Sequence, residues 1–265
     1  MSNINMANRQ VADVDIRDYK TKKPIIHVET ANTTTAGLTS DNVYAMAKGT
    51  RRIAFNNPLE GTMSIELQVY PFQLFSLFSD GVIENKGVYA TSAVITATTD
   101  GILVLPEIPK ILDNSVFVYP EDAYMDDTAL IAGTFTNAHI GQSSSSPATF
   151  TATDENDIVA GQKYKVAFIA NEYPNELGVG SNAHRVSFNN SKLPTDYFIT
   201  MRTLDKTEDG LYTPFLLTAY KATIQRNFEL SFSSEGDPAS ITLNFDLCED
   251  SDGNVLDMVE LEDND

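Results

Sequence analysis

Hydrophobic and polar residues alternate along several stretches of the chain, and a period of two is typical of β-strands with one buried face. The clearest stretch is TMSIELQV at residues 62–69, and a second is ASITLNFDL at residues 239–247. Between them lie short β-rich runs separated by turn-rich segments; these runs are VYATSAVITAT, GILVL, SVFVY, KYKVAFIA and HRVSF. Short strands at this spacing predict a mainly β fold, a β-sandwich or partial barrel.

The longest alternation precedes the second of these strands, in LLTAYKATIQRNFELSFSSEGDP at residues 216–238. It predicts one long strand with Ile224, Phe228 and Leu230 on its buried face. The chain then turns back through EGDP into the strand at 239–247, which predicts a hairpin. Arg226 falls on the apolar side of the pattern, so we expect a bulge, a strand junction or a charge paired at an interface there.

One helix is predicted, in YPFQLFSLFSDG at residues 70–81, where Pro71 suits a first helical turn and Gly81 suits a stop. Its apolar residues are Phe72, Leu74, Phe75, Leu77 and Phe78. They spread around more of the circumference than a surface helix needs. We therefore expect the helix to be buried in the core or partly covered by another subunit.

The chain as a whole, residues 1–265, is interpreted as a single domain. Residues 1–30 predict a polar N-terminal arm followed by a first strand. Residues 30–50 contain few large apolar side chains and predict a long loop, either a surface loop or an arm that orders against a neighbouring subunit. SSSSP at residues 143–147 resembles a linker, but the strands on either side have the same character, so the chain is not divided there.

Composition narrows the classes of partner. Lysine and arginine number 18 against 37 acidic residues, which gives a net charge of −19 and disfavours binding to nucleic acid or anionic membranes. The single cysteine, Cys248, excludes an intramolecular disulfide. Because no stretch has the ~18 apolar residues of a membrane span and the start lacks the apolar core of a signal peptide, we expect a soluble chain that Sec does not export.

Catalytic and metal-binding signatures are weak. The three histidines, His27, His139 and His184, lie far apart in sequence, and nucleophile-elbow, phosphate-loop and H-E-x-x-H motifs are absent. DKTEDG at residues 205–210 and EDSDGN at 249–254 resemble calcium loops but depart from the EF-hand pattern, which favours solvated turns. We expect no enzyme activity, cofactor or metal.

Two segments carry a resemblance to a known family. FELSFSSEGDPASITLNFDLCEDSDGNVLDMVEL at residues 228–261 combines a strand, an E-G-D-P turn, a second strand and an acidic turn with glycine. KGTRRIAFNNPLEGTMSIELQVYPFQLFSLFSDG at residues 48–81 combines an arginine-containing strand, a second strand and the helix. With SVFVYPED and HRVSFNNSKLPTDYFITMRT between them, they follow the order of tail tube (major tail) proteins of long-tailed bacteriophages, which the chain resembles.

This resemblance implies a β-sandwich with one flanking helix. It also implies that the sheets of six subunits join into a ring with an inner β-barrel, and that rings stack into a tube that carries viral DNA. The implied partners are further copies of the chain and the tape measure, tail tip or baseplate, and terminator proteins. The implied location is the virion, after synthesis in the host cytoplasm, with no membrane contact.

The polar faces of the matched strands then supply candidates for the channel wall. These are Ser64, Glu66, Gln68, Glu229, Ser231, Asn244 and Asp246. None is lysine or arginine, so we expect DNA to pass without capture of its phosphates. An ordinary solvated sheet face would instead carry a mixture of charges.

Candidates for contacts between subunits come from the 30–50 segment, the helix and the irregular Arg226. The family's long hairpin loop packs on adjacent subunits, and the 30–50 segment resembles it. The candidates are Lys48, Arg51, Arg52, Phe72, Phe75, Phe78 and Arg226. Residues at about 120–185 are expected to form an outward decoration.

Two other functions stay open. A β-sandwich recognition module, such as an adhesin or baseplate domain, would bind a host glycan or protein. A glycosidase would use a pair of the abundant carboxylates. The absence of tryptophan, which stacks on sugar rings, and of tail-fibre repeats favours the tube.

Overall fold

The chain packs as two compact units in a computed structural model, which describes residues 5–105, 111–112, 114–136, 148–172, 183–230, 234–236 and 238–261. Met1–Val82 and Val186–Asp265 form the first, here called the sheet unit, and Ile83–Arg185 form the second, the inserted unit. Each unit has its own hydrophobic core. The segment at about 120–185, predicted as a decoration, lies within the inserted unit, which begins earlier, at Ile83.

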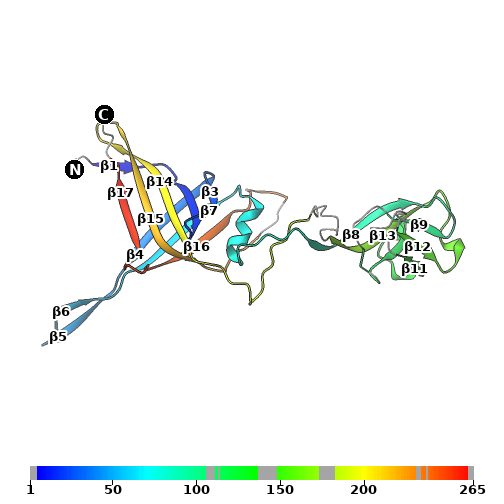
Figure 1. Ribbon diagram of the computed structural model, residues 1–265, viewed down its shortest axis with the longest axis horizontal. Helices are drawn as coiled ribbons and strands as arrows, with labels where there is room; N and C mark the ends of the chain where they lie inside the picture. The colour runs from blue at the N-terminus through cyan, green and yellow to red at the C-terminus, as the bar shows by residue number, and fades with distance from the viewer. Residues whose placement is uncertain are drawn as a thin grey trace. The chain divides into compact units, whose positions relative to one another are not determined.

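The sheet unit is built on a nine-stranded antiparallel sheet with the strand order β3-β2-β14-β15-β16-β7-β4, in which β1 also pairs with β14 and β17 with β15 (Figure 1). Its strands are β1 (Met6–Asn8), β2 (Asp13–Asp18), β3 (Pro24–Val28), β4 (Ala31–Thr39), β7 (Glu60–Leu67), β14 (Tyr197–Thr207), β15 (Tyr212–Ile224), β16 (Ile241–Cys248) and β17 (Leu256–Glu260). The mainly β prediction is confirmed. No closed barrel forms within the described part of a single chain.

Side-chain alternation places one face of this sheet in the core. In β7, Met63, Ile65 and Leu67 are buried, and in β16 the residues opposite Met63 and Ile65 are Phe245 and Leu243. Each buried pair removes apolar surface from water, which stabilises the folded state by roughly 25 cal/mol per Å² of buried surface. The two strands predicted from TMSIELQV and ASITLNFDL are therefore confirmed.

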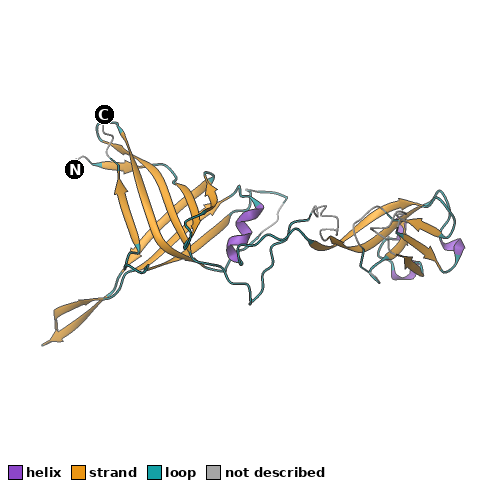
Figure 2. Cartoon of the chain, in the orientation of Figure 1, coloured by secondary structure: helices purple, strands orange, loops and turns teal. Residues whose placement is uncertain are grey.

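The predicted helix is a 3₁₀ helix, η1 (Phe72–Phe78), which Figure 2 shows at one end of the large sheet. Leu74, Leu77 and Phe78 are buried, so the helix closes the core of the sheet unit. Tyr197 of β14 fixes it there, because its buried hydroxyl donates a hydrogen bond of 2.9 Å to the carbonyl of Leu77. Burial raises the pKa of Tyr197 to about 12.

The Tyr197→Phe variant is expected to lower the free energy of unfolding by about 1 kcal/mol, because the Leu77 carbonyl loses its donor. Tyr212→Phe is the matched control, because Tyr212 is 53% exposed and its replacement should leave stability unchanged.

The stabilisation that Tyr197 provides should persist below pH 10 and disappear as the pH rises through about 12, because its pKa is raised in the folded state. Urea unfolding measures the free energy of unfolding of each variant, and an absorbance titration of tyrosinate measures the pKa of Tyr197. Equal losses of stability in Tyr197→Phe and Tyr212→Phe would contradict the role of the Tyr197 hydroxyl.

The long strand predicted up to residue 233 is wrong for residues 225–230, and residues 231–233 lie outside the described part of the chain. β15 ends at Ile224, and residues 225–230 lie outside any strand. The chain leaves the sheet because Phe228 packs into an aromatic cluster, with ring centroids 4.8 Å from Phe78 and 5.8 Å from Phe75. The described residues before EGDP therefore do not form the first arm of the predicted hairpin.

Arg226 lies in this irregular segment and is exposed. Its Nη2 donates a hydrogen bond of 3.0 Å to the carbonyl of Asn189. β15 ends two residues before Arg226, so the expected bulge or strand junction is not seen there, and a charge paired at an interface stays a prediction. Its guanidinium therefore holds two segments of the sheet unit together.

Residues 30–50 form strands rather than the predicted loop. The segment contains β4, which pairs with β7, and most of a two-stranded hairpin formed by β5 (Asn42–Ala47) and β6 (Thr50–Asn56). β4 needs few large apolar side chains because most of its residues are exposed and backbone pairing with β7 holds it in the sheet. Its threonines suit an extended backbone, and Thr35 hydrogen-bonds to Ser64 of β7.

The inserted unit contains two three-stranded sheets, β10-β13-β8 and β11-β12-β9. Its elements are β8 (Gly87–Thr96), β9 (Ile102–Val104), β10 (Phe117–Pro120), η2 (Glu121–Ala123), η3 (Asp127–Ala129), β11 (Gly133–Thr136), β12 (Thr149–Ala152), η4 (Glu155–Asp157) and β13 (Lys163–Glu172). Its core includes Val118, Phe150 and Val166. Its two ends meet at a β-bridge between Glu84 and Arg185, with two backbone hydrogen bonds of 2.9 Å, and Arg185 also pairs with the Glu84 carboxylate.

Candidate functional site

The face of the large sheet opposite the core is polar, and pairing between β7 and β16 brings four predicted channel residues together on it. Ser64 lies directly opposite Asn244. Glu66 follows Ser64 by two residues on β7, and Asp246 follows Asn244 by two residues on β16. Because the strands are antiparallel, these two carboxylates lie on either side of the Ser64–Asn244 pair, on the same face. The four side chains are half-buried or exposed, whereas the residues that alternate with them are buried.

The other three predicted channel residues have different positions. Gln68 follows the last residue of β7 and continues its polar side, half-buried. Glu229 is exposed but lies outside any strand, because β15 has already ended. Ser231 lies outside the described residues. The polar face expected along one long strand therefore ends where β15 ends, at Ile224.

Four basic residues share this polar face and are not among the predicted channel residues: Arg17 of β2, Arg202 and Lys206 of β14, and Lys221 of β15. Arg17 Nη2 lies 3.2 Å from Asp15 Oδ2, and Lys221 Nζ lies 3.8 Å from Asp196 Oδ2. The alternation in DVDIRD was the signal that could have found Arg17. The face as a whole therefore carries both signs of charge, although its β7–β16 part carries no cation.

The edge strands of the large sheet are β3 on one side and β4 on the other. β4 is nine residues long and contains no charged residue. Within the described residues it pairs only with β7, so its outer row of backbone groups has no strand partner there. An unpaired, uncharged edge is a ready template for a strand of another chain.

The hairpin of β5 and β6 extends away from the large sheet (Figure 1). Lys48 and Gly49 form its turn, and both have positive φ values, 52° and 79°, as tight hairpin turns require. Val43 lies opposite Phe55, and Ala45 lies opposite Ile53. Val43, Ile53 and Phe55 are each 57% exposed, so one face of the hairpin is an exposed apolar surface.

The three basic candidates for subunit contacts all lie on this hairpin. Lys48 is at its turn, and Arg52 is exposed on β6. Arg51 packs its guanidinium 4.3 Å from the centroid of the Tyr44 ring. The hairpin therefore presents an apolar surface together with cations at its turn end, in a chain whose net charge is −19.

The three aromatic candidates on η1 differ in exposure. Phe78 is 1% exposed and packs against Phe228, so it offers no surface to another subunit. Phe75 is partly buried against the same ring. Phe72 is 50% exposed. Only Phe72 has the exposed area that a contact between subunits would need.

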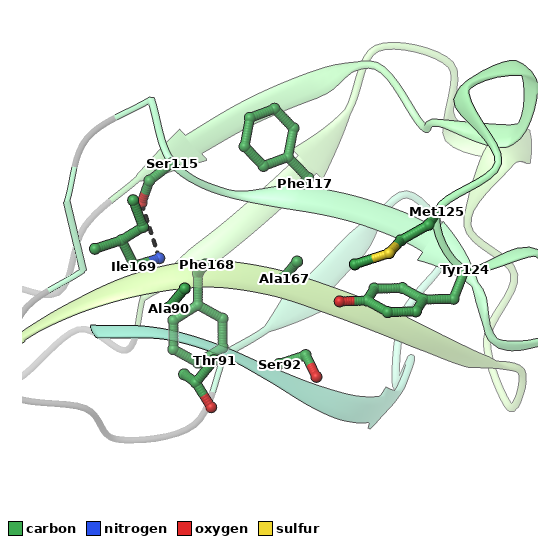
Figure 3. Close-up of a pocket in the computed structure, with 10 residues that line it drawn as sticks. All are labelled: Ala90, Thr91, Ser92, Ser115, Phe117, Tyr124, Met125, Ala167, Phe168 and Ile169. Atoms are coloured by element: carbon green, nitrogen blue, oxygen red, sulfur yellow. Dashed lines mark hydrogen bonds between the residues drawn. The ribbon is translucent and has the colours of Figure 1, made fainter. Parts of the chain in front are cut away.

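The inserted unit contains a groove of about 410 Å³ on the outer face of its β10-β13-β8 sheet (Figure 3). Ala90, Ser92 and Ala167 are its small residues, and Phe117, Tyr124 and Met125 are its large ones. Lys165 Nζ lies 4.1 Å from the centroid of the Tyr124 ring. The combination of aromatic rings and small residues suits a flat, partly apolar ligand.

The acidic turns behave as capped turns. In EDSDGN, the carboxylate of Asp250 accepts hydrogen bonds from the backbone amides of Asp252 and Asn254, at 2.9 and 2.8 Å. The bond from Asn254 is the main cause of the lowered pKa of Asp250. Among the described residues, no group of three His, Cys, Asp or Glu is placed to hold a metal ion.

No helix in the described part of the chain is long and apolar enough to span a bilayer. A protein-family model described as the YomU/Tube protein family matches residues 9–260. No curated protein matches the chain. The family match covers both segments on which the resemblance to tail tube proteins rests and extends through the inserted unit.

Proposed function

The chain belongs to the YomU/Tube protein family and is a phage tail tube protein, and from this we propose that it polymerises as stacked hexameric rings into a hollow tube that conducts viral DNA into the host. In this proposal it is a structural subunit without catalytic activity. Its partners are further copies of itself and the tape measure, tail tip or baseplate, and terminator proteins. It is made in the host cytoplasm and resides in the virion.

The open nine-stranded sheet is the observation that carries this proposal. Among the described residues, the two edge strands expose backbone donors and acceptors apart from the Ile25 carbonyl of β3, which accepts a hydrogen bond from Gln73. Pairing β3 of one copy with β4 of the next would satisfy the rest. Repeating such a head-to-tail contact around an axis closes a ring. The core faces would then lie outside the ring of strands, and the polar faces would line its channel.

Charge on the polar face is compatible with passage of DNA. The β7–β16 region that carries Ser64, Glu66, Asn244 and Asp246 has no cation to hold a phosphate. Arg17 is engaged by Asp15, and Lys221 lies near Asp196, which weakens their attraction for DNA. Arg202 and Lys206 of β14 are the cations from which a local contact with the phosphate backbone is expected.

The apolar face of the β5–β6 hairpin supplies the contact to a neighbouring subunit. An isolated two-stranded hairpin is marginally stable in water, so Val43, Ile53 and Phe55 need a partner surface to become buried. Lys48 at its turn would pair with acidic groups of the neighbour.

Ile53→Asp is therefore expected to block polymerisation while leaving the subunit folded. A carboxylate buried in the contact would raise the critical concentration for assembly more than about tenfold, which corresponds to about 1.4 kcal/mol. Ala54→Asp adds the same charge on the other face of the same strand and should still assemble. Sedimentation measures assembly and thermal melting measures folding; normal polymers of Ile53→Asp would contradict the proposed contact.

Electron microscopy of the concentrated protein tests the function itself. Stacked rings with a central hole, formed by the protein alone or when a tail-tip complex nucleates them, are expected. Compact monomers that persist under both conditions would overturn the proposal.

A recognition module is the second candidate, and the groove of the inserted unit favours it. Phe117 and Tyr124 offer ring faces to a sugar or a peptide, with Ser92 and Lys165 as polar neighbours. This alternative predicts a small defined oligomer that binds host-surface glycan or protein. Loss of that binding in Phe117→Ala, with unchanged folding, would support it over the tube.

A further inference from the structure

His27 of the edge strand β3 lies between two carboxylates. Its Nδ1 is 2.6 Å from Asp15 Oδ1, and its Nε2 is 3.0 Å from Glu29 Oε1. A neutral imidazole has one N–H group and can donate to only one of them. Because a carboxylate can only accept, both short contacts are satisfied together only when the ring is protonated.

The contact to Asp15 crosses between two strands. Asp15 of β2 and His27 of β3 are directly opposite in the register, and β2 is the strand partner of β3 among the described residues. The second oxygen of Asp15 accepts a hydrogen bond of 3.2 Å from Arg17 Nη2. The result is a row of alternating charge, Arg17, Asp15, His27 and Glu29, along one edge of the sheet.

Two further charges border this row. Asp13 lies two residues before Asp15 on the same face of β2, and Arg202 of β14 lies opposite Asp13. The residues of β14 opposite Asp15 and Arg17 are Thr200 and Phe198, which carry no charge. The groove beside His27 is lined by Glu29, Thr30, Val69, Tyr70 and Pro71. Asp15 and Glu29 are the acidic groups that contact His27, and Arg17 is the cation that competes for Asp15.

We propose that His27 is a proton-dependent clasp that fixes the edge strand β3 to β2, closed when the imidazole is charged and open when it is neutral. Opening leaves Asp15 and Glu29 facing a ring with a single donor. The strand then keeps its backbone pairing, but one of the two contacts is lost, and a contact to Asp15 that remains is no longer an ion pair. The clasp is a property of the single chain and does not depend on the proposed assembly.

The protonation equilibria agree with this geometry. The hydrogen bond to Asp15 raises the pKa of His27, with a smaller contribution from Glu29, while burial opposes the shift. Burial also acts to raise the pKa of Asp15, but its contacts to His27 and Arg17 outweigh it and lower that pKa. A raised histidine pKa means that the stabilisation is complete below the ordinary value of about 6.5 and is lost as the pH rises through the folded-state value.

An NMR titration of the full chain from pH 5 to 9 tests the clasp. His184 is the internal control, because its Nδ1 faces the neutral amide oxygen of Asn85 at 3.0 Å. The pKa of His27 should lie above its ordinary value of about 6.5. Asp15→Asn and Glu29→Gln should each lower the pKa of His27.

Hydrogen exchange gives the second measurement. Protection of the β3 amides, corrected for intrinsic exchange, should fall as the pH rises through the pKa of His27, while protection in β16 stays constant. The His27→Gln variant should abolish this pH dependence, and His184→Gln should retain it. A His27 pKa at or below about 6.5, or β3 protection that does not change with pH, would overturn the proposal.

Discussion

Replacing Phe245 with aspartate is expected to leave no folded protein. Phe245 is 1% exposed, lies opposite Met63 and packs edge-on against Tyr197, with ring centroids 6.3 Å apart. Loss of a buried phenylalanine alone costs about 3–5 kcal/mol, and burial of an unpaired carboxylate adds to it. That sum approaches the roughly 5–15 kcal/mol by which domains are stable. Circular dichroism and the yield of soluble protein measure the outcome.

Leu230→Asp is the matched control for this variant. The alternation in the sequence places Leu230 on a buried face, but the structure puts it outside any strand and 39% exposed. We expect its free energy of unfolding to change by less than about 0.5 kcal/mol, as for other surface substitutions. Equal damage from both variants would mean that residues 225–230 contribute to the core after all.

Removal of residues 83–185, with a short Gly-Ser linker joining Val82 to Val186, is expected to leave the sheet unit folded. The two ends of the inserted unit already meet at the Glu84–Arg185 bridge, so a short linker spans the same gap. The two cores have no buried residue in common. We expect the free energy of unfolding of the sheet unit to change by about 1 kcal/mol or less, because the length of the connection enters only logarithmically.

NMR spectra of the shortened and full chains measure this result, because the signals of β7 and β16 should superimpose. A deletion of residues 72–185 serves as the control, since it also removes η1 with Leu74, Leu77 and Phe78 from the core. That variant should unfold. Loss of structure in both deletions would show that the sheet unit depends on the inserted unit.

The sequence predicted those elements whose buried side is set by the polar and apolar positions within the element itself. β7 and β16 follow their polar and apolar positions, and η1 follows its dense apolar run. The end of β15 was not predictable in this way, because Phe228 keeps the parity of the strand and is drawn away by rings distant in sequence. β4 was missed because most of its residues are exposed, so it carries no apolar alternation of its own and is held in the sheet by backbone pairing with β7.

The polar face was predictable one strand at a time, not as a whole. Ser64 and Asn244 each lie on the polar side of a strand that the sequence identifies, and their pairing follows from the fold. Arg202 and Lys221 belong to the same face only because β14 and β15 stand between β2 and β16 in the sheet. Strand order is a long-range property, so no local pattern contains it.

The exposed face of the β5–β6 hairpin also bears on the kinetics of association. A subunit that displays Val43, Ile53 and Phe55 before it meets its neighbour is adhesive. Its net charge of −19 makes two free subunits repel one another before their apolar surfaces come into contact. At physiological ionic strength the repulsion decays over about 8 Å, and added salt shortens that reach. We therefore expect the rate of association to rise with ionic strength. At low ionic strength the same negative charge keeps free subunits apart.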